Sequence, residues 1–179
     1  MSLDLSELYD RLYRFCYFRL RKREQAQDIV QETFTRYIDR YGKLDEKSVP
    51  VLYTIARNLC IDHFRRYREQ TGFDSPFPED SPASPEDLQT SENRTDELIT
   101  RLAVQRALSG LPDEEAEVLL LVITDGFSVR DTGKILGISR FAVYRRLREG
   151  KKHLREGLRS EGLEDRSAGR IAERREGEE

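Results

Sequence analysis

The stretch LGISRFAVYRRLREGKKHLRE, residues 136–156, decides the fold of the C-terminal half of the chain. Its apolar residues leave one stripe at helical spacing, made by Leu136, Ile138, Val143, Leu147 and Leu154. Seven Arg or Lys residues and one acid lie between Ser139 and Arg155, a local net charge of +6, whereas the whole chain of 179 residues carries −3. Such a concentration of positive charge on one short helix indicates a polyanionic partner.

The residues before this helix have the spacing of a helix-turn-helix motif. Ser128–Leu136 form a short predicted helix, Gly137 permits the positive φ of a tight turn, and Ser139 is suited to cap the next helix. Gly133 stands where the two helices must approach closely, so a side chain there would push them apart. Branched apolar residues after the turn fill the wedge between the helices. The pattern predicts a helix-turn-helix.

The second helix of such a motif lies in the major groove of DNA, and residues near its N-terminal half reach base edges. A solvated surface helix would carry mixed charges, which this one does not. Lys and Arg residues further along the helix suit phosphates, which add affinity without sequence information. The predicted DNA-binding set is Ser139, Arg140, Tyr144, Arg145, Arg148, Lys151 and Lys152, followed by Arg155 on the phosphate side.

The net charge hides a segregation along the chain. Residues 1–70 carry +3, residues 71–97 carry −7, residues 98–158 carry +3 and residues 159–179 carry −2. The acidic segment holds four prolines among Ser, Asp and Glu, which forbids a continuous helix and predicts an extended, flexible linker. The linker is either a solvated tether or a strap that lies in a basic channel of a partner. The tail, 159–179, is expected to be mostly disordered.

The remaining segments have helical periodicity and no convincing alternation with period two. Apolar stripes in the first block contain Leu5, Leu8, Leu12, Phe15 and Cys16, then Ile29, Val30, Phe34, Tyr37 and Ile38, then Leu52, Ile55, Ala56 and Leu59. In the second block, helices are expected at about 96–109 and from Pro112 toward Gly126. The predicted fold is all-α, with two small helical domains at 1–69 and 98–158 joined by the acidic linker at 70–97.

The helix predicted at 51–68 mixes basic and aromatic residues. Guanidinium groups can meet phosphates while rings stack on unpaired bases, so the mixture suits a nucleic-acid strand. The competing interpretation is a core helix with a basic end. An earlier helix, 28–38, presents a polar face that is either solvated or a partner site. The residues of the basic and aromatic set are Tyr53, Arg57, Asn58, His63, Phe64, Arg65, Arg66, Tyr67 and Arg68.

Other functional classes receive little support. The two cysteines, Cys16 and Cys60, lie far apart in apolar segments, which predicts buried, reduced thiols and a cytoplasmic protein. No apolar stretch approaches the roughly 20 residues that span a bilayer. With two histidines and no metal-ligand spacing, phosphate loop or nucleophile motif, neither an enzyme nor a cofactor, metal or small-molecule substrate is expected.

Taken together, the motifs resemble those of bacterial RNA polymerase sigma factors of the extracytoplasmic-function (ECF) group. The family element D-x-V-Q-E-x-F is matched by Asp28, Val30, Gln31, Glu32 and Phe34. The element I-A-R-N-x-x-x-D-x-x-R-R is matched by Ile55, Ala56, Arg57, Asn58, Asp62, Arg65 and Arg66. The run L-P-x-x-x-x-x-V-x-x-L is matched by Leu111, Pro112, Val118 and Leu121. The helix-turn-helix element is matched by Gly126, Ser128, Leu136 to Ser139, Arg146 and Leu147.

The resemblance implies a role for each part of the chain. Asp28, Gln31, Glu32 and Phe34 would bind the clamp of the largest subunit of core RNA polymerase. The −10 promoter element would be recognised and melted by Tyr41, Tyr53, Arg57, Asn58, His63, Arg65 and Arg66. The helix-turn-helix would read the −35 element beside the polymerase flap, and the acidic linker would run toward the RNA-exit path. An anti-sigma factor would hold the protein inactive.

The sequence departs from the family at several positions. It has no tryptophan, and Val51 stands where many relatives have one. The loop at 41–50 is unusual, and the Arg140–Phe141 pair replaces small residues, which indicates an individual −35 preference. Gly133 and Gly150 lie inside helices, where glycine costs up to ~1 kcal/mol relative to alanine. The alternative function is a free-standing helix-turn-helix regulator, which requires a sensing site in 1–70 and does not bind core polymerase.

Overall fold

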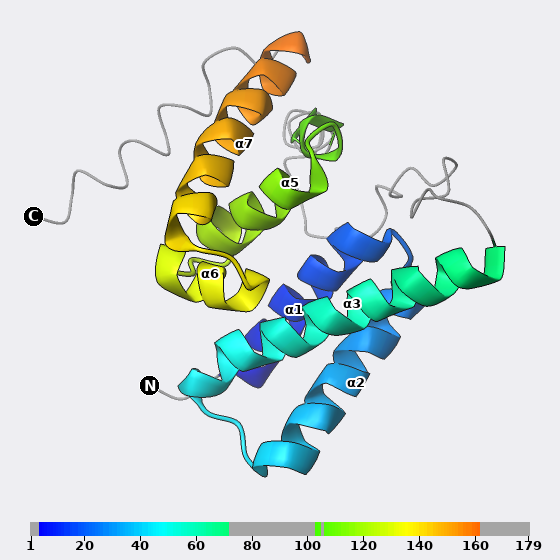
Figure 1. Ribbon diagram of the computed structural model, residues 1–179. Coiled ribbons are helices and arrows are strands. Elements are labelled where there is room, and N and C mark those ends of the chain that lie inside the picture. The colour runs from blue at the N-terminus through cyan, green and yellow to red at the C-terminus, as the bar shows by residue number, and fades with distance from the viewer. Residues whose placement is uncertain (1–3, 72–102, 105, 162–179) are drawn as a thin grey trace, which may run out of the picture.

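The computed structural model describes residues 4–71, 103–104 and 106–161, and within these ranges the chain forms helices and no strands (Figure 1). The N-terminal unit consists of α1 (Leu5–Leu20), α2 (Arg23–Tyr41), the 3₁₀ turn η1 (Glu46–Ser48) and α3 (Val49–Thr71). The C-terminal unit contains α5 (Asp113–Leu119), the π-helical turn η3 (Leu120–Thr124), α6 (Val129–Leu136) and α7 (Arg140–Ser160). The predicted all-α fold is confirmed.

Local signals set the ends of the N-terminal helices. The Asp4 carboxylate accepts hydrogen bonds from the backbone N–H groups of Ser6 and Glu7 and thereby caps α1. Arg21 ends the helix in a left-handed conformation, with φ 55°. Before α3, the Ser48 side chain and the Asp45 side chain form a reciprocal capping box. These caps satisfy the backbone groups that each helix end leaves unpaired.

The core of the N-terminal unit is built from the apolar stripes that the sequence shows. Fully buried side chains include Leu12, Phe15 and Leu52, which pack between α1, α2 and α3. The Tyr37 hydroxyl donates to Ser48 Oγ at 2.7 Å and fixes the turn between α2 and α3. Cys16 and Cys60 are buried and free, as predicted.

The helix-turn-helix forms as its spacing predicts. Gly137 adopts φ 67°, a conformation that few other residues accept without strain. A Cβ added at Gly133 would lie 2.9 Å from the backbone oxygen of Ile138, so the turn can form only because that position lacks a side chain. Ser139 Oγ accepts from the backbone N–H of Ala142 at 3.2 Å and caps α7. The predicted role of each of these residues is confirmed.

Gly150 has a structural reason that the sequence alone did not reveal. It is buried where α7 crosses α5, and a Cβ there would lie 3.1 Å from Leu119 Cδ1 and 3.2 Å from Glu115 Cβ. The same crossing is closed by a hydrogen bond of 2.7 Å between His153 Nδ1 and Glu115 Oε2. The glycine therefore weakens the helix locally but lets two helices approach closely.

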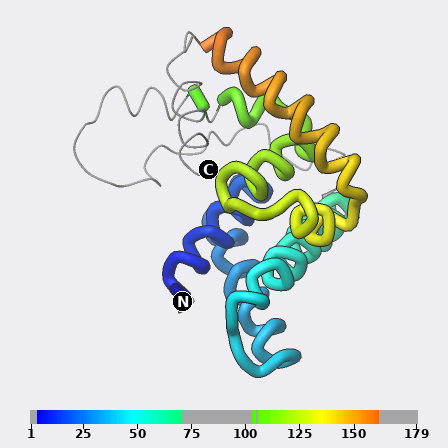
Figure 2. Tube along the Cα trace, turned by 90° about the vertical axis from the view of Figure 1, so that its left-hand side faces the viewer, coloured from blue at the N-terminus to red at the C-terminus, as the bar shows by residue number. Residues whose placement is uncertain are grey.

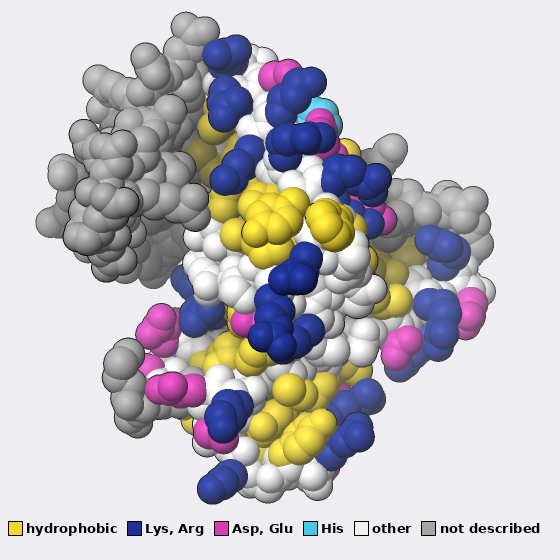
Figure 3. Space-filling model, turned by 60° about the vertical axis from the view of Figure 1, so that its left-hand side comes forward, with side chains coloured by type: hydrophobic (Ala, Val, Ile, Leu, Met, Phe, Trp, Pro, Cys, Tyr) yellow, Lys and Arg dark blue, Asp and Glu magenta, His cyan; other side chains and the backbone are white. Residues whose placement is uncertain are grey.

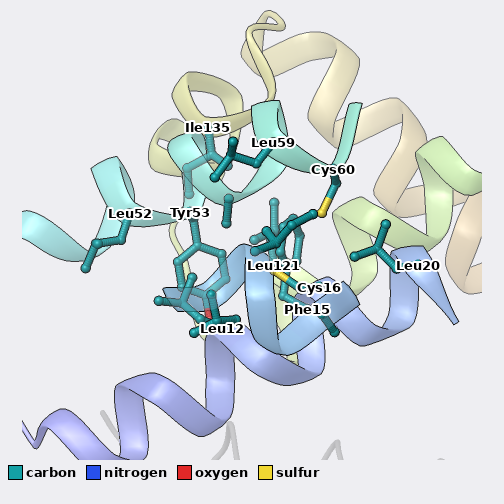
Figure 4. Packing of buried hydrophobic residues seen from close by; sticks show 14 of the residues in the cluster. Leu12, Phe15, Cys16, Leu20, Leu52, Tyr53, Leu59, Cys60, Leu121 and Ile135 are labelled. Atoms are coloured by element: carbon teal, nitrogen blue, oxygen red, sulfur yellow. The ribbon is translucent and has the colours of Figure 1, made fainter. Parts of the chain in front are cut away.

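The two units pack against each other. Figure 2 shows the C-terminal unit lying across the bundle formed by α1, α2 and α3, with α6 against α3. Leu121 and Ile135 of the C-terminal unit join the buried cluster that contains Tyr53 and Leu59 of α3 (Figure 4). A single apolar cluster therefore runs through both units.

Parts of the expected organisation lie outside the described residues. These parts are most of the acidic linker, the first part of the helix expected at 96–109, and the tail from residue 162 onward. The end of the expected helix is present, since residues 106–109 are helical. At the other boundary, α3 runs through Thr71, slightly past the predicted start of the linker.

Candidate nucleic-acid and polymerase interfaces

The outward face of α7 gathers the basic residues predicted to bind DNA. Arg140, Tyr144, Arg145, Arg148, Lys151 and Lys152 are all exposed, as is Ser139 at the N-cap. Figure 3 shows Lys and Arg side chains around a hydrophobic patch on the side of the molecule where α7 lies. The face therefore combines charge for phosphates with flat apolar surface for bases.

Neighbouring arginines on α7 have different surroundings. Arg146 points back into the C-terminal unit, where it pairs with Glu114 at 2.5 Å and has a side chain only 19% exposed. Arg148, by contrast, is 78% exposed and pairs with Glu149 of its own helix, at 3.0 Å. Because of the helical period, Arg146 and Arg148 lie on different sides of α7. Arg146 holds α7 against α5, whereas Arg148 is available to a ligand.

Phe141 is a candidate contact residue that the predicted DNA-binding set omitted. Its side chain is 86% exposed on the second residue of α7, and Tyr144 beside it on the same face is 60% exposed. Together the two side chains form an exposed aromatic patch, and contiguous exposed apolar patches often mark interaction sites. The sequence did indicate this position, because Phe141 is an aromatic residue where the family has small ones.

The predicted polymerase-binding residues divide into two kinds. Asp28, Gln31 and Glu32 are exposed along one face of α2, and Glu32 accepts from Arg36 Nε at 2.6 Å. Phe34 is half-buried and stacks on Tyr9 of α1, with ring centroids 6.3 Å apart. The first three can meet a partner directly, whereas Phe34 holds α2 in place beneath them.

The predicted −10 set is spread along α3 and the end of α2. Tyr41 is 49% exposed, and Asn58, Arg65 and Arg66 are exposed on α3. His63 is half-buried, and its pKa is lowered first by burial and then by the positive charges of Lys22 and Arg66. At neutral pH the lowered pKa favours the uncharged imidazole, so His63 offers a hydrogen-bonding ring rather than a charge.

Tyr53 and Arg57, the other two residues of that set, are covered in this arrangement. The Tyr53 ring is fully buried between Phe15, at 5.3 Å, and Phe127 of the C-terminal unit, at 4.8 Å. Burial raises the pKa of the Tyr53 hydroxyl, so the phenol stays protonated. Arg57 Nε donates to Glu117 Oε1 at 3.0 Å. Neither side chain faces water freely.

In 4–71 and 106–161 no three His, Cys, Asp or Glu side chains come together in a way that could hold a metal ion. None of the helices in these ranges is both long enough and apolar enough to cross a bilayer.

The described residues form helices only, and the second helix of the helix-turn-helix is exposed and basic. This architecture is that of a DNA-binding protein. The Sigma-70 region 2 family matches residues 5–70, and the Sigma-70 region 4 family matches residues 101–154. The chain is 30% identical to the ECF RNA polymerase sigma factor SigW of Bacillus subtilis, over 87% of this chain and 88% of that protein. It belongs to the ECF RNA polymerase sigma factors, which direct transcription initiation.

Other similarities agree with this assignment. SigX of Bacillus subtilis is 28% identical, with coverage of 86% of this chain and 82% of SigX. SigM of Mycobacterium tuberculosis is 29% identical, with coverage of 80% and 69%. Among solved structures, the sigma factor RpoE of Bartonella quintana, in complex with the anti-sigma factor NepR, has a TM-score of 0.69 at 22% identity. The match covers 87% of this chain and 94% of that chain, and shows a shared fold.

Proposed function

We propose that the two units divide promoter recognition between them, with the C-terminal unit reading the −35 element and the N-terminal unit binding core RNA polymerase and the −10 element. The observation that carries the proposal is the basic face of α7, a helix that Ser139 caps at its start. The basic residues of this face, from Arg140 to Lys152, are exposed. Arg145 and Arg148 lie on this face within the part of the helix that reaches base edges. Lys151 and Lys152 lie further along and are suited to phosphates.

Replacing Arg145 or Arg148 with alanine is expected to lower transcription from the cognate promoter about tenfold or more, because a bidentate arginine–guanine contact contributes about 1–3 kcal/mol of discrimination. Binding to core polymerase should stay unchanged. The measurement is run-off transcription with each purified variant beside a polymerase pull-down. Arg159→Ala is the control, since Arg159 is exposed at the far end of α7. An equal loss of both activities would contradict the division of labour.

The docking face on α2 is proposed to contact the clamp of the largest polymerase subunit. Asp28, Gln31 and Glu32 share one exposed face at i, i+3 and i+4 spacing, which suits a helix-to-helix contact. Phe34 would act by holding the helix through its stack on Tyr9.

The double change Gln31→Ala with Glu32→Ala should reduce the affinity for core polymerase at least about tenfold, since it removes two of the three exposed polar side chains of the proposed docking face. DNA retardation by the free chain should not change. Pull-down of the variant with core polymerase measures the loss. Asp10→Ala, which removes an exposed acid from α1, is the matched control and should bind as the wild type does. A normal pull-down by the double variant would exclude this face.

The proposal extends to the location of the protein, its linker and its regulating partner. It acts in the cytoplasm as a non-catalytic subunit without a cofactor, and its acidic linker follows the RNA-exit path of the polymerase. An anti-sigma factor restrains it, by analogy with the Bartonella quintana sigma factor whose structure contains one. The alternative of a free-standing regulator has no supporting observation in the described residues of the N-terminal unit, whose three helices pack around one apolar core.

The deciding experiment is a pull-down of the purified chain with bacterial core RNA polymerase, followed by run-off transcription from a library of genomic fragments. Stable binding and discrete new start sites are expected, and the aligned upstream sequences give both promoter elements. Retardation of DNA by the chain without polymerase binding would instead identify a free-standing regulator.

A further inference from the structure

The basic face of α7 has an aromatic residue at its N-terminal end. Phe141 is the second residue of α7, and its side chain, 86% exposed, is the most open of the large hydrophobic side chains described. Arg145, Arg148 and Lys152 follow it at i+4, i+7 and i+11, so the four side chains lie in one row along the helix. All four are exposed. Phe141 therefore begins the row whose other members are proposed to bind DNA.

Tyr144 enlarges the apolar surface beside Phe141. It follows Phe141 by three residues, which places it on the neighbouring turn of the same helix face, and it is 60% exposed. Figure 3 shows a hydrophobic patch with Lys and Arg side chains around it on the side of the molecule where α7 lies. Protein–DNA interfaces are much more positively charged than interfaces between proteins. The charge around the aromatic pair therefore favours DNA over a protein as the molecule that covers it.

The chemistry of the major groove limits what a phenylalanine ring can contact there. The N-terminal part of a recognition helix lies closest to the base edges, and Phe141 is in that part. Base edges present hydrogen-bond donors and acceptors, which the ring cannot pair with, and one apolar group, the 5-methyl of thymine. Covering a donor or acceptor without replacing its hydrogen bond costs free energy. Covering a methyl group is favourable, because both surfaces leave water.

We propose that Phe141 is a specificity-determining residue of this chain, whose ring packs on the 5-methyl group of a thymine in the −35 element. The inference rests on the proposed function, in which α7 lies in the major groove of that element, and it adds the chemical group read at one base pair. Arg145 and Arg148, further along the row, donate hydrogen bonds to neighbouring base edges. The −35 element therefore contains an A·T pair at the position that Phe141 covers.

Templates with deoxyuridine in place of thymine test the inference. The exchange, made one position at a time in either strand of the −35 element, removes the methyl group and keeps every hydrogen-bonding group. At a holoenzyme concentration below saturation, run-off transcription with the wild-type chain should fall about fourfold at the thymine that Phe141 covers, the effect of one apolar methyl group left in water. Phe141→Ala should transcribe the two templates equally. Phe141→Leu, which keeps an apolar side chain, should retain most of the difference.

The matched control is Ile123→Ala, which also removes an exposed apolar side chain from the C-terminal unit. Ile123 is 46% exposed and lies in η3 rather than on α7, so the variant should keep the full effect of the methyl group. Phe141→Ala should unfold at the same temperature as the wild type, since its side chain makes little contact with the rest of the fold. It should also bind core polymerase as the wild type does.

A −35 element without an A·T pair, or a wild-type holoenzyme that responds to no thymine methyl group, would overturn the inference. An equal response in the wild type and Phe141→Ala would assign the methyl group to another residue, with the same consequence. Weaker binding of Phe141→Ala to core polymerase, without a methyl effect, would identify a protein as the partner of the patch. Failure of the wild-type chain to bind core polymerase would instead count against the proposed function. The template comparison would then use retardation of a duplex that the chain selects from a random pool.

Discussion

Replacing Gly133 with valine is expected to unfold the helix-turn-helix and abolish −35 recognition. A Cβ at this position already lies 2.9 Å from the backbone oxygen of Ile138, and valine adds two methyl groups beside Val143, whose Cγ2 is 3.7 Å from that Cβ. Overpacking of this kind costs about 1–3 kcal/mol and sometimes more. Replacing glycine with a residue of higher helix propensity stabilises the helix by at most about 1 kcal/mol. The cost of the clash therefore exceeds the gain in helix propensity, and Gly133→Val should lower the free energy of unfolding by about 3 kcal/mol or more.

Thermal unfolding followed by circular dichroism measures this loss, together with retardation of promoter DNA. Gly133→Ala should fall between the wild type and the valine variant. Gly110→Ala is the control for an added methyl group, because a Cβ there meets only backbone oxygens at 3.7 Å. It should change the free energy of unfolding by less than about 1 kcal/mol. A valine variant as stable as the wild type would mean that α6 and α7 do not approach at Gly133.

Replacing Tyr53 with alanine should lower the free energy of unfolding by about 3–5 kcal/mol, the range for a large aromatic side chain removed from a packed core. Tyr53 is fully buried and contacts aromatic rings of both units. The cavity would open at the centre of the cluster that α1, α3 and the C-terminal unit share. Denaturant unfolding monitored by circular dichroism measures the change.

Tyr53→Phe separates the ring from the hydroxyl. Because the buried hydroxyl has no hydrogen-bond partner, its removal takes away a desolvation cost of about 1–3 kcal/mol, and the variant should be as stable as the wild type or more so. A large loss in Tyr53→Phe would mean that the hydroxyl is paired with Asp125 or Arg11 in solution. A small loss in Tyr53→Ala would mean that the ring is not part of the core.

Much of the fold was predictable because helices are set by short-range patterns. The apolar stripes of 5–16, 29–38 and 52–59 repeat at the period of one helix face, so each stripe identified a helix and most of its buried side. Leu5 and Ile38, at the ends of two of the stripes, are exposed instead. The turn at Gly137 and the cap at Ser139 depend on residues within a few positions of each other. The exposed arginines of α7 followed from the same helical period.

The surroundings of individual polar residues were less predictable. Glu117 stands in an acidic run at 113–117 that reads as a solvated first turn of a helix, yet it is among the most buried charged residues described. Its partners Arg19 and Arg57 are 98 and 60 positions away in the sequence. Periodicity carries no information about pairing over such distances.

The sequence by itself determined that this protein is helical, that its C-terminal half carries a helix-turn-helix, and which side of α7 is basic. These features rest on local backbone preferences and on helical periodicity, both of which act within a few residues. Only the tertiary structure decided that Gly150 permits a helix crossing and that Tyr53 and Arg57 are covered by the C-terminal unit. Those outcomes depend on how two units meet, because packing and the pairing of buried charges join side chains that are distant in the chain.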